Sequence, residues 1–115
     1  MAYSTIDKPN THFNPVIYTG NGSTQSITGV NFQPDFVWLK ERNNVASHKL
    51  YDIVRGATEV LESDGTYAEG TDVNGLTAFN SDGFSLGSSG SNNGSGDTYA
   101  SWNWKAGGTA VSNTA

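Results

Sequence analysis

The sequence has no cysteine, only three prolines and few charged residues, and each scarcity removes a class of protein. Without cysteine the chain has no disulfide, no thiolate nucleophile and no thiolate-bound zinc, so packing alone has to stabilise the fold. Six basic residues stand against eleven acidic ones, giving a net charge of −5 and no basic stripe for a nucleic-acid backbone. No run approaches the roughly 20 apolar residues of a membrane span. We therefore expect neither nucleic-acid binding nor membrane insertion.

Small and turn-forming residues dominate what is present. Glycine, serine, threonine and asparagine make up 51 of the 115 residues, and 35 % of the chain is hydrophobic. This mixture disfavours long helices and suits short strands joined by tight turns. The sequence therefore predicts one all-β domain of antiparallel strands.

Short apolar runs separated by turn residues locate the expected strands. The run at 36–40 is apolar on both faces, which is typical of a central strand, and 50–54 is its expected neighbour. Asn80-Ser81-Asp82 predicts a hairpin turn. Strands are expected at residues 16–19, 26–30, 36–40, 50–54, 57–61, 76–79, 83–87 and 97–105.

The pattern also suggests how the chain is divided. Residues 1–12 show no strand or helix period and are interpreted as an N-terminal arm before a sandwich domain at 13–107. Residues 108–115 lose all periodicity and are interpreted as a tail or linker. Residues 87–96 are almost wholly glycine, serine and asparagine, which predicts a flexible loop tip.

The last predicted strand places Ala100, Trp102 and Trp104 on one face. In one interpretation the tryptophans fill the core, and replacing Trp104 by alanine would then cost about 3–5 kcal/mol. In the other, they join Trp38 and Tyr51 as a platform on which sugar rings stack. A chain without disulfides needs large side chains inside, which favours the core interpretation.

No catalytic residues and no cofactor are predicted. The only histidines are His12 in the arm and His48 near a loop, and the carboxylates are scattered without a legible pairing. Asp72-Val73-Asn74-Gly75 offers oxygen ligands of the kind that calcium prefers, but it is not an EF-hand loop and turn capping explains it equally well. Asp52 and Arg55 are expected to form an ion pair at a strand end. The protein is not expected to be an enzyme or to bind a metal.

Five blocks of the chain resemble, in the same order, a β-sandwich domain found widely in structural and tail or adhesion proteins of tailed bacteriophages. The blocks are residues 18–30, 32–40, 52–57, 76–87 and 96–107. The resemblance implies an antiparallel β-sandwich of the concanavalin-like or jelly-roll type. It brings no catalytic residues with it.

The resemblance implies a non-enzymatic virion protein, located in a particle assembled in the host cytoplasm and partnered by capsid or tail subunits. The short single domain favours a capsid-surface decoration, or cement, protein that is oligomeric on the particle. Tyr3 and Ile6 of the arm would dock on a neighbouring subunit. The alternative is a tail-fibre or receptor-binding module that holds host glycans through Asn43, Asn44, Asn92 and Asn93. A glycan hydrolase ranks behind both.

Overall fold

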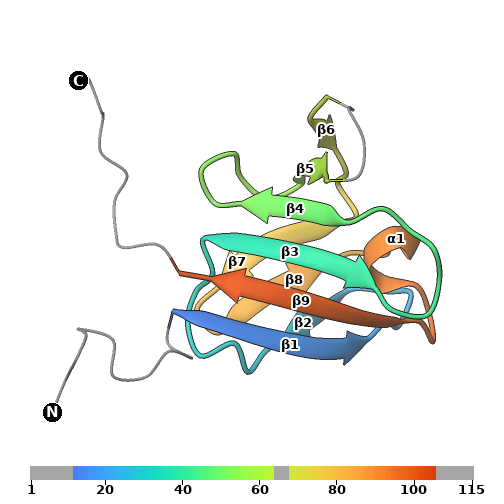
Figure 1. Cartoon of the computed structure of the whole chain (residues 1–115), viewed down its shortest axis with the longest axis horizontal. Coiled ribbons are helices and arrows are strands. Elements are labelled where there is room, and N and C mark those ends of the chain that lie inside the picture. The colour runs from blue at the N-terminus through green and yellow to red at the C-terminus, as the bar shows by residue number, and fades with distance from the viewer. Residues whose placement is uncertain (1–11, 64–67, 106–115) are drawn as a thin grey trace, which may run out of the picture.

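A large antiparallel sheet packs against a smaller one in the computed structural model, which describes residues 12–63 and 68–105 (Figure 1). The predicted all-β antiparallel sandwich is confirmed. In spatial order the large sheet contains β1 (Phe13–Thr19), β9 (Thr98–Trp104), β3 (Phe36–Glu41), β4 (Lys49–Asp52), β5 (Glu59–Glu62) and β6 (Gly70–Thr71). The small sheet contains β2 (Gln25–Ile27), β8 (Gly83–Leu86) and β7 (Leu76–Asn80), and a single helical turn, α1 (Gly90–Asn93), precedes β9.

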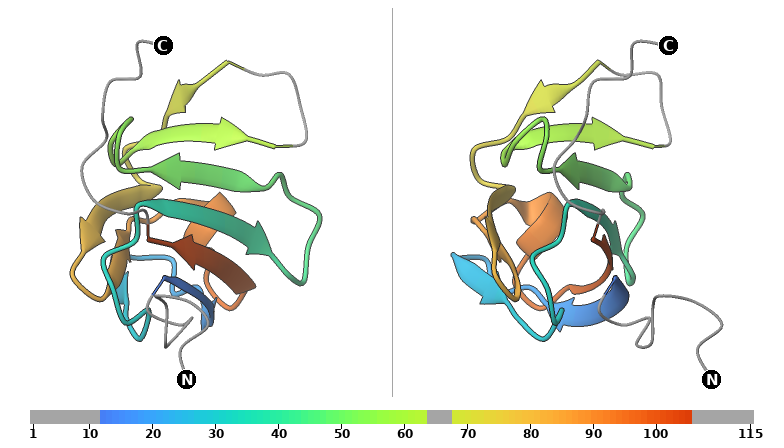
Figure 2. Two further views of the ribbon diagram at one scale, coloured as in Figure 1. Left: turned by 60° about the vertical axis from the view of Figure 1, so that its left-hand side comes forward. Right: turned by 90° about the vertical axis from the view of Figure 1, so that its left-hand side faces the viewer.

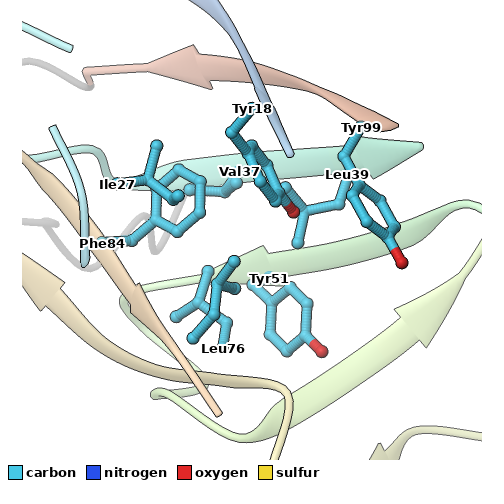
Figure 3. Packing of buried hydrophobic residues seen from close by; sticks show 9 residues of the cluster. Tyr18, Ile27, Val37, Leu39, Tyr51, Leu76, Phe84 and Tyr99 are labelled. Carbon is cyan, nitrogen blue, oxygen red and sulfur yellow. The ribbon is translucent and has the colours of Figure 1, made fainter. Parts of the chain in front are cut away.

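The core lies between the two sheets, which Figure 2 shows edge-on as separate layers. Val37 and Leu39 of the central strand β3 are buried, as alternation along a half-buried strand requires, and belong to the same core cluster as Phe84 of the small sheet. Figure 3 shows three tyrosine rings from the large sheet among these aliphatic side chains. The cluster comprises Tyr18, Ile27, Val37, Leu39, Tyr51, Leu76, Phe84, Leu86 and Tyr99.

The hydroxyl groups of the three core tyrosines hold α1 against the end of the sandwich. Tyr18 donates to the main-chain oxygen of Asn92 at 2.8 Å, and the amide of Asn92 donates to the hydroxyl of Tyr51 at 2.8 Å. Tyr99 donates to the main-chain oxygen of Gly90 at 3.1 Å. The prediction of a flexible tip over residues 87–96 is therefore wrong for α1, because buried phenols fix it.

Burial of these phenols predicts a delayed alkaline titration. Desolvation raises the pKa of Tyr18, Tyr51 and Tyr99 above the ordinary tyrosine value. Because folding raises these pKa values, the phenols' contribution to the free energy of unfolding is fully present below the pKa of unfolded tyrosine, about 10. That contribution is lost as the pH rises through the pKa values of the folded protein. Absorbance titration should show these phenols ionising at higher pH in native protein than in urea-unfolded protein, together with alkaline unfolding. Identical native and unfolded curves would contradict the burial.

Strand β2 ends sooner than the sequence predicts, at Ile27 instead of Val30. Gly29 and Asn31 both adopt positive φ, at 86° and 77°, which turns the chain out of the sheet. The carboxylate of Asp82 accepts hydrogen bonds from the main-chain N–H groups of these two residues, at 3.0 and 2.7 Å. A side chain from the β7–β8 turn thus fixes this bend.

Candidate functional site

The most distinctive surface of the molecule is the outer face of the large sheet, the face turned toward the viewer in Figure 1. Burial alternates along β9, where Tyr99, Ser101 and Asn103 are fully buried while the residues between them are half-buried. The same alternation on β3 turns Phe36 and Trp38 away from the core. Aromatic side chains are thereby placed outside the sandwich.

The strand register aligns these outward side chains in two rows that cross the sheet. Residues directly opposite one another on neighbouring strands share a face, so the register fixes the neighbours. In the first row Trp104 of β9 lies between Phe13 of β1 and Phe36 of β3. The second row crosses β1, β9, β3, β4 and β5 and contains Pro15, Trp102, Trp38, Leu50 and Leu61. We call these two rows together the aromatic face.

Ring contacts hold the aromatic face in a defined arrangement. Trp104 has its ring centroid 5.0 Å from that of Phe13 and 5.2 Å from that of Phe36. Trp38 and Trp102 meet edge to face, with centroids 5.9 Å apart and planes inclined by 62°. Such geometries are the favourable ones for aromatic pairs. The rings therefore form a fixed surface.

A hydrogen bond to the loop before β4 further orients Trp38. Its indole N–H donates to Nδ1 of His48 at 2.8 Å. This bond requires Nδ1 to be unprotonated, so a neutral His48 carries its proton on Nε2. His48, one of the two histidines of the chain, thus lies beside the aromatic face and supports Trp38.

The three tryptophans line a shallow hollow of about 260 Å³. It opens on the outer face between β3 and β9, and its walls are indole rings. All three tryptophans of the chain are found here. Another hollow of about 260 Å³ lies over the small sheet and is lined by Thr24, Gln25, Ser26, Thr77, Ser85 and Leu86, with no aromatic ring.

The prediction that Trp102 and Trp104 fill the core is wrong. Their strand face was predicted correctly as shared with Ala100, but it is the outer one. The inner face can accept polar residues because they bond to β1: Ser101 Oγ donates to the main-chain oxygen of Val16 at 2.9 Å. The side-chain amide nitrogen of Asn103 donates to the main-chain oxygen of Asn14 at 2.9 Å. Buried donors cost little when they are bonded in this way.

Strand β1 forms the free edge of the sheet beside the aromatic face, and a proline interrupts its row of N–H donors. At the two ends of the β1–β9 pair, the main-chain N–H of Lys105 donates to the main-chain oxygen of His12 and that of Gly20 donates to the main-chain oxygen of Asp97. Both distances are 2.8 Å. Because bonding alternates along an antiparallel pair, residue 15 points its backbone to the free edge of β1. Proline there offers no N–H donor, a common device on edge strands. The edge strand therefore lacks one of the N–H donors that an added strand would pair with.

The structure separates the four asparagines predicted to contact a glycan. Asn43 and Asn44 are exposed after β3, and their amides donate to Asp97 Oδ1 at 3.2 and 3.0 Å. Asn92 and Asn93 are 1 % and 0 % exposed. The prediction is therefore wrong for Asn92 and Asn93, because side chains turned into the protein cannot reach a surface glycan.

Asn93 instead joins the β1–β2 loop to the end of β8 from inside the protein. Its amide nitrogen donates to Asn21 Oδ1 at 3.1 Å, to the main-chain oxygen of Gly87 at 2.9 Å and to that of Ser23. Its Oδ1 accepts from the main-chain N–H of Asn21 at 3.0 Å. The β1–β2 loop is thereby fixed to the end of β8.

Replacing Asn93 by alanine should lower the free energy of unfolding by about 1–3 kcal/mol, because several polar groups inside the protein lose their partner. Chemical denaturation of the variant would measure the loss. Asn44→Ala removes an exposed asparagine of the same type and should cost much less. Equal losses for the two variants would contradict the assigned role of Asn93.

The remaining predicted residues have structural partners or lie outside the described part of the chain. Arg55 forms the predicted ion pair with Asp52 and also reaches the main-chain oxygen of Leu50 at 3.2 Å. Asp72 Oδ1 accepts from the N–H of Asn74 at 3.0 Å, as turn capping requires. Tyr3 and Ile6 lie outside the described residues. Over residues 12–63 and 68–105, no group of three or more histidine, aspartate or glutamate side chains is arranged to hold a metal.

Comparison with protein families finds one match, to a domain of unknown function (DUF7483) over residues 8–115. The chain belongs to this family. No curated protein matches the chain, and no solved structure does. In the described part of this DUF7483 domain, no helix is both long and apolar enough to span a membrane. The aromatic face is the feature of this member from which a function can be argued.

Proposed function

We propose that this protein is a non-enzymatic structural protein of a bacteriophage virion, and that it decorates the capsid by docking on neighbouring shell subunits. The observation that carries the docking proposal is the aromatic face, where tryptophan and phenylalanine side chains stand outside the core. The phage assignment rests on the five sequence blocks that resemble tailed-phage β-sandwich domains.

Physical arguments support docking through this face. An apolar patch on a soluble domain marks an interaction site, and aromatic residues are enriched at the centres of protein interfaces. The rings are already fixed by contacts with one another and with His48, so binding would order few side chains. On a symmetric shell many such contacts act together, so each copy needs only a modest affinity.

Particles depleted of the protein provide the test. Purified chain is added back, and its occupancy is measured separately on capsids and on isolated tails. We expect saturable binding to capsids at regular positions. Binding to tails alone would contradict the decoration role.

The hollow between the tryptophans favours one second candidate, a tail-fibre or receptor-binding module that stacks a host sugar on an indole ring. On this account Asn43 and Asn44 would not be the main contacts, because their amides are engaged with Asp97. A glycan array separates the candidates, since selective glycan binding is expected only for the receptor-binding module.

The arm gives a further prediction for the decoration role. Deleting residues 2–11 should leave the sandwich folded, because its first strand begins at Phe13. Incorporation into depleted capsids should be lost, because Tyr3 and Ile6 are proposed to bury against a neighbouring subunit. Circular dichroism checks the fold and cosedimentation the incorporation. Equal occupancy for full-length and truncated chains would show that the arm has no docking role.

A further inference from the structure

We propose that the hollow lined by Trp38, Trp102 and Trp104 receives a basic side chain, arginine or lysine, presented by the docking partner. This inference rests on the proposed docking function for the source of the cation. The hollow itself can be tested with small molecules, independently of any particle.

The walls of the hollow are aromatic. Three indole rings line the hollow, and the planes of Trp38 and Trp102 are inclined by 62°. Indole is the aromatic group that attracts a cation most strongly over its ring face, and several inclined rings can surround one cation. A sugar would instead need hydrogen-bonding side chains around it to satisfy its hydroxyl groups, and the lining consists of tryptophans.

The described residues place no cation of their own in the hollow, because its lining consists of the three tryptophans. Lys40 is the basic residue nearest in register, since it lies opposite Ala100 in the row beside Trp102. Its ammonium group turns aside and donates to the main-chain oxygen of Glu41 at 3.1 Å. The rings are therefore left for a cation from another molecule.

The charge of the chain complements that of a basic side chain. The chain carries a net charge of −5, which attracts a basic partner surface at long range and disfavours an acidic one. An apolar hollow in an acidic protein thus suits a side chain with an aliphatic stem and a cationic end. Arginine and lysine have this construction.

The experiment compares arginine with citrulline, which has nearly the same shape but no charge. Nα-acetylarginine amide and Nα-acetylcitrulline amide are titrated separately into the full-length chain, and the three indole N–H signals are followed by NMR. All tryptophans of the chain line the hollow, so every indole signal reports on it. We expect arginine to bind about 2- to 30-fold more tightly than citrulline, the range that cation–π contacts provide.

Two variants test whether the preference for arginine over citrulline arises in the hollow. Trp102→Leu should remove the preference for arginine, whereas Thr77→Ala, on the outer face of the small sheet, should retain it. Equal binding of arginine and citrulline, or no response of any indole signal, would overturn the proposal. A response to methyl β-glucoside but not to arginine would also overturn it and would favour the glycan module.

Failure of the basic-side-chain proposal and failure of the proposed decoration role give different experimental results. If capsid docking depends on the aromatic face but arginine shows no preference over citrulline, only the basic-side-chain proposal fails. If arginine is preferred but the chain does not dock on capsids, the hollow binds cations and the decoration role fails.

Discussion

Replacing Phe84 by alanine is expected to lower the free energy of unfolding by about 3–5 kcal/mol, the usual cost of removing a buried aromatic ring. Phe84 is 0 % exposed in the core between the two sheets, where its ring meets that of Tyr18 edge to face at 6.2 Å. Phe84 belongs to the core cluster, so its removal leaves a cavity among the surrounding buried side chains. Urea denaturation followed by circular dichroism would measure the loss.

Trp104→Ala is the matched comparison, because Trp104 is also a large aromatic residue but lies on the aromatic face. It is half-buried and contacts Phe13 and Phe36, so its removal should cost only about 1–2 kcal/mol. A loss as large as that of Phe84→Ala would mean that the outer face stabilises the fold as a core does. The argument that these rings serve binding would then fail.

Removing Trp38 and Trp102 together is expected to weaken binding to depleted capsids by at least about 30-fold, while the domain stays folded. Tryptophan at the centre of an interface commonly contributes about 2 kcal/mol or more to the free energy of binding. A loss of about 2 kcal/mol weakens the affinity about 30-fold. The two indoles contact each other and form two walls of the hollow, so the double variant removes its centre. Cosedimentation over a range of protein concentrations gives the change in affinity.

Thr77→Ala controls for nonspecific effects, because Thr77 is exposed on the small sheet at the opposite side of the sandwich. This variant should bind capsids as the unmodified chain does. If the double tryptophan variant also binds normally, docking does not use the aromatic face.

Local patterns were enough to predict much of the sheet. The run at 36–40 is apolar on both faces, and the structure places β3 between β9 and β4, as a central strand with the predicted neighbour. The hairpin around Asn80-Ser81-Asp82 is also confirmed, as β7 and β8 pair across that turn. These features depend on neighbouring residues in the sequence, so sequence reasoning reaches them.

The orientation of β9 could not be predicted in the same way. Alternation shows that Trp102 and Trp104 share a face, but it does not show which face meets the other sheet. Side-chain size favoured the tryptophans as the core residues. The outcome depends on hydrogen bonds from the Ser101 hydroxyl and the Asn103 amide nitrogen to β1, more than 80 positions away in the sequence, which give these two buried donors their acceptors.

The burial of Asn92 and Asn93 depends on distant contacts as well. Their neighbourhood is rich in glycine and serine and suggests a mobile loop. The phenol groups of Tyr18 and Tyr51, supplied by β1 and β4, bond to Asn92 and hold the segment inside. A tyrosine placed on a strand does not reveal in the sequence which loop its hydroxyl will reach.

The most direct test of the central claim is a density map of the particle at a resolution that shows the orientation of the two sheets. The account predicts this domain at regular positions on the capsid, with the outer face of the large sheet against shell subunits and the small sheet toward solvent. A basic side chain of the shell should enter the hollow between Trp38, Trp102 and Trp104. A map that places the domain on the capsid with these tryptophans facing solvent, or that places it only on the tail, would contradict the account.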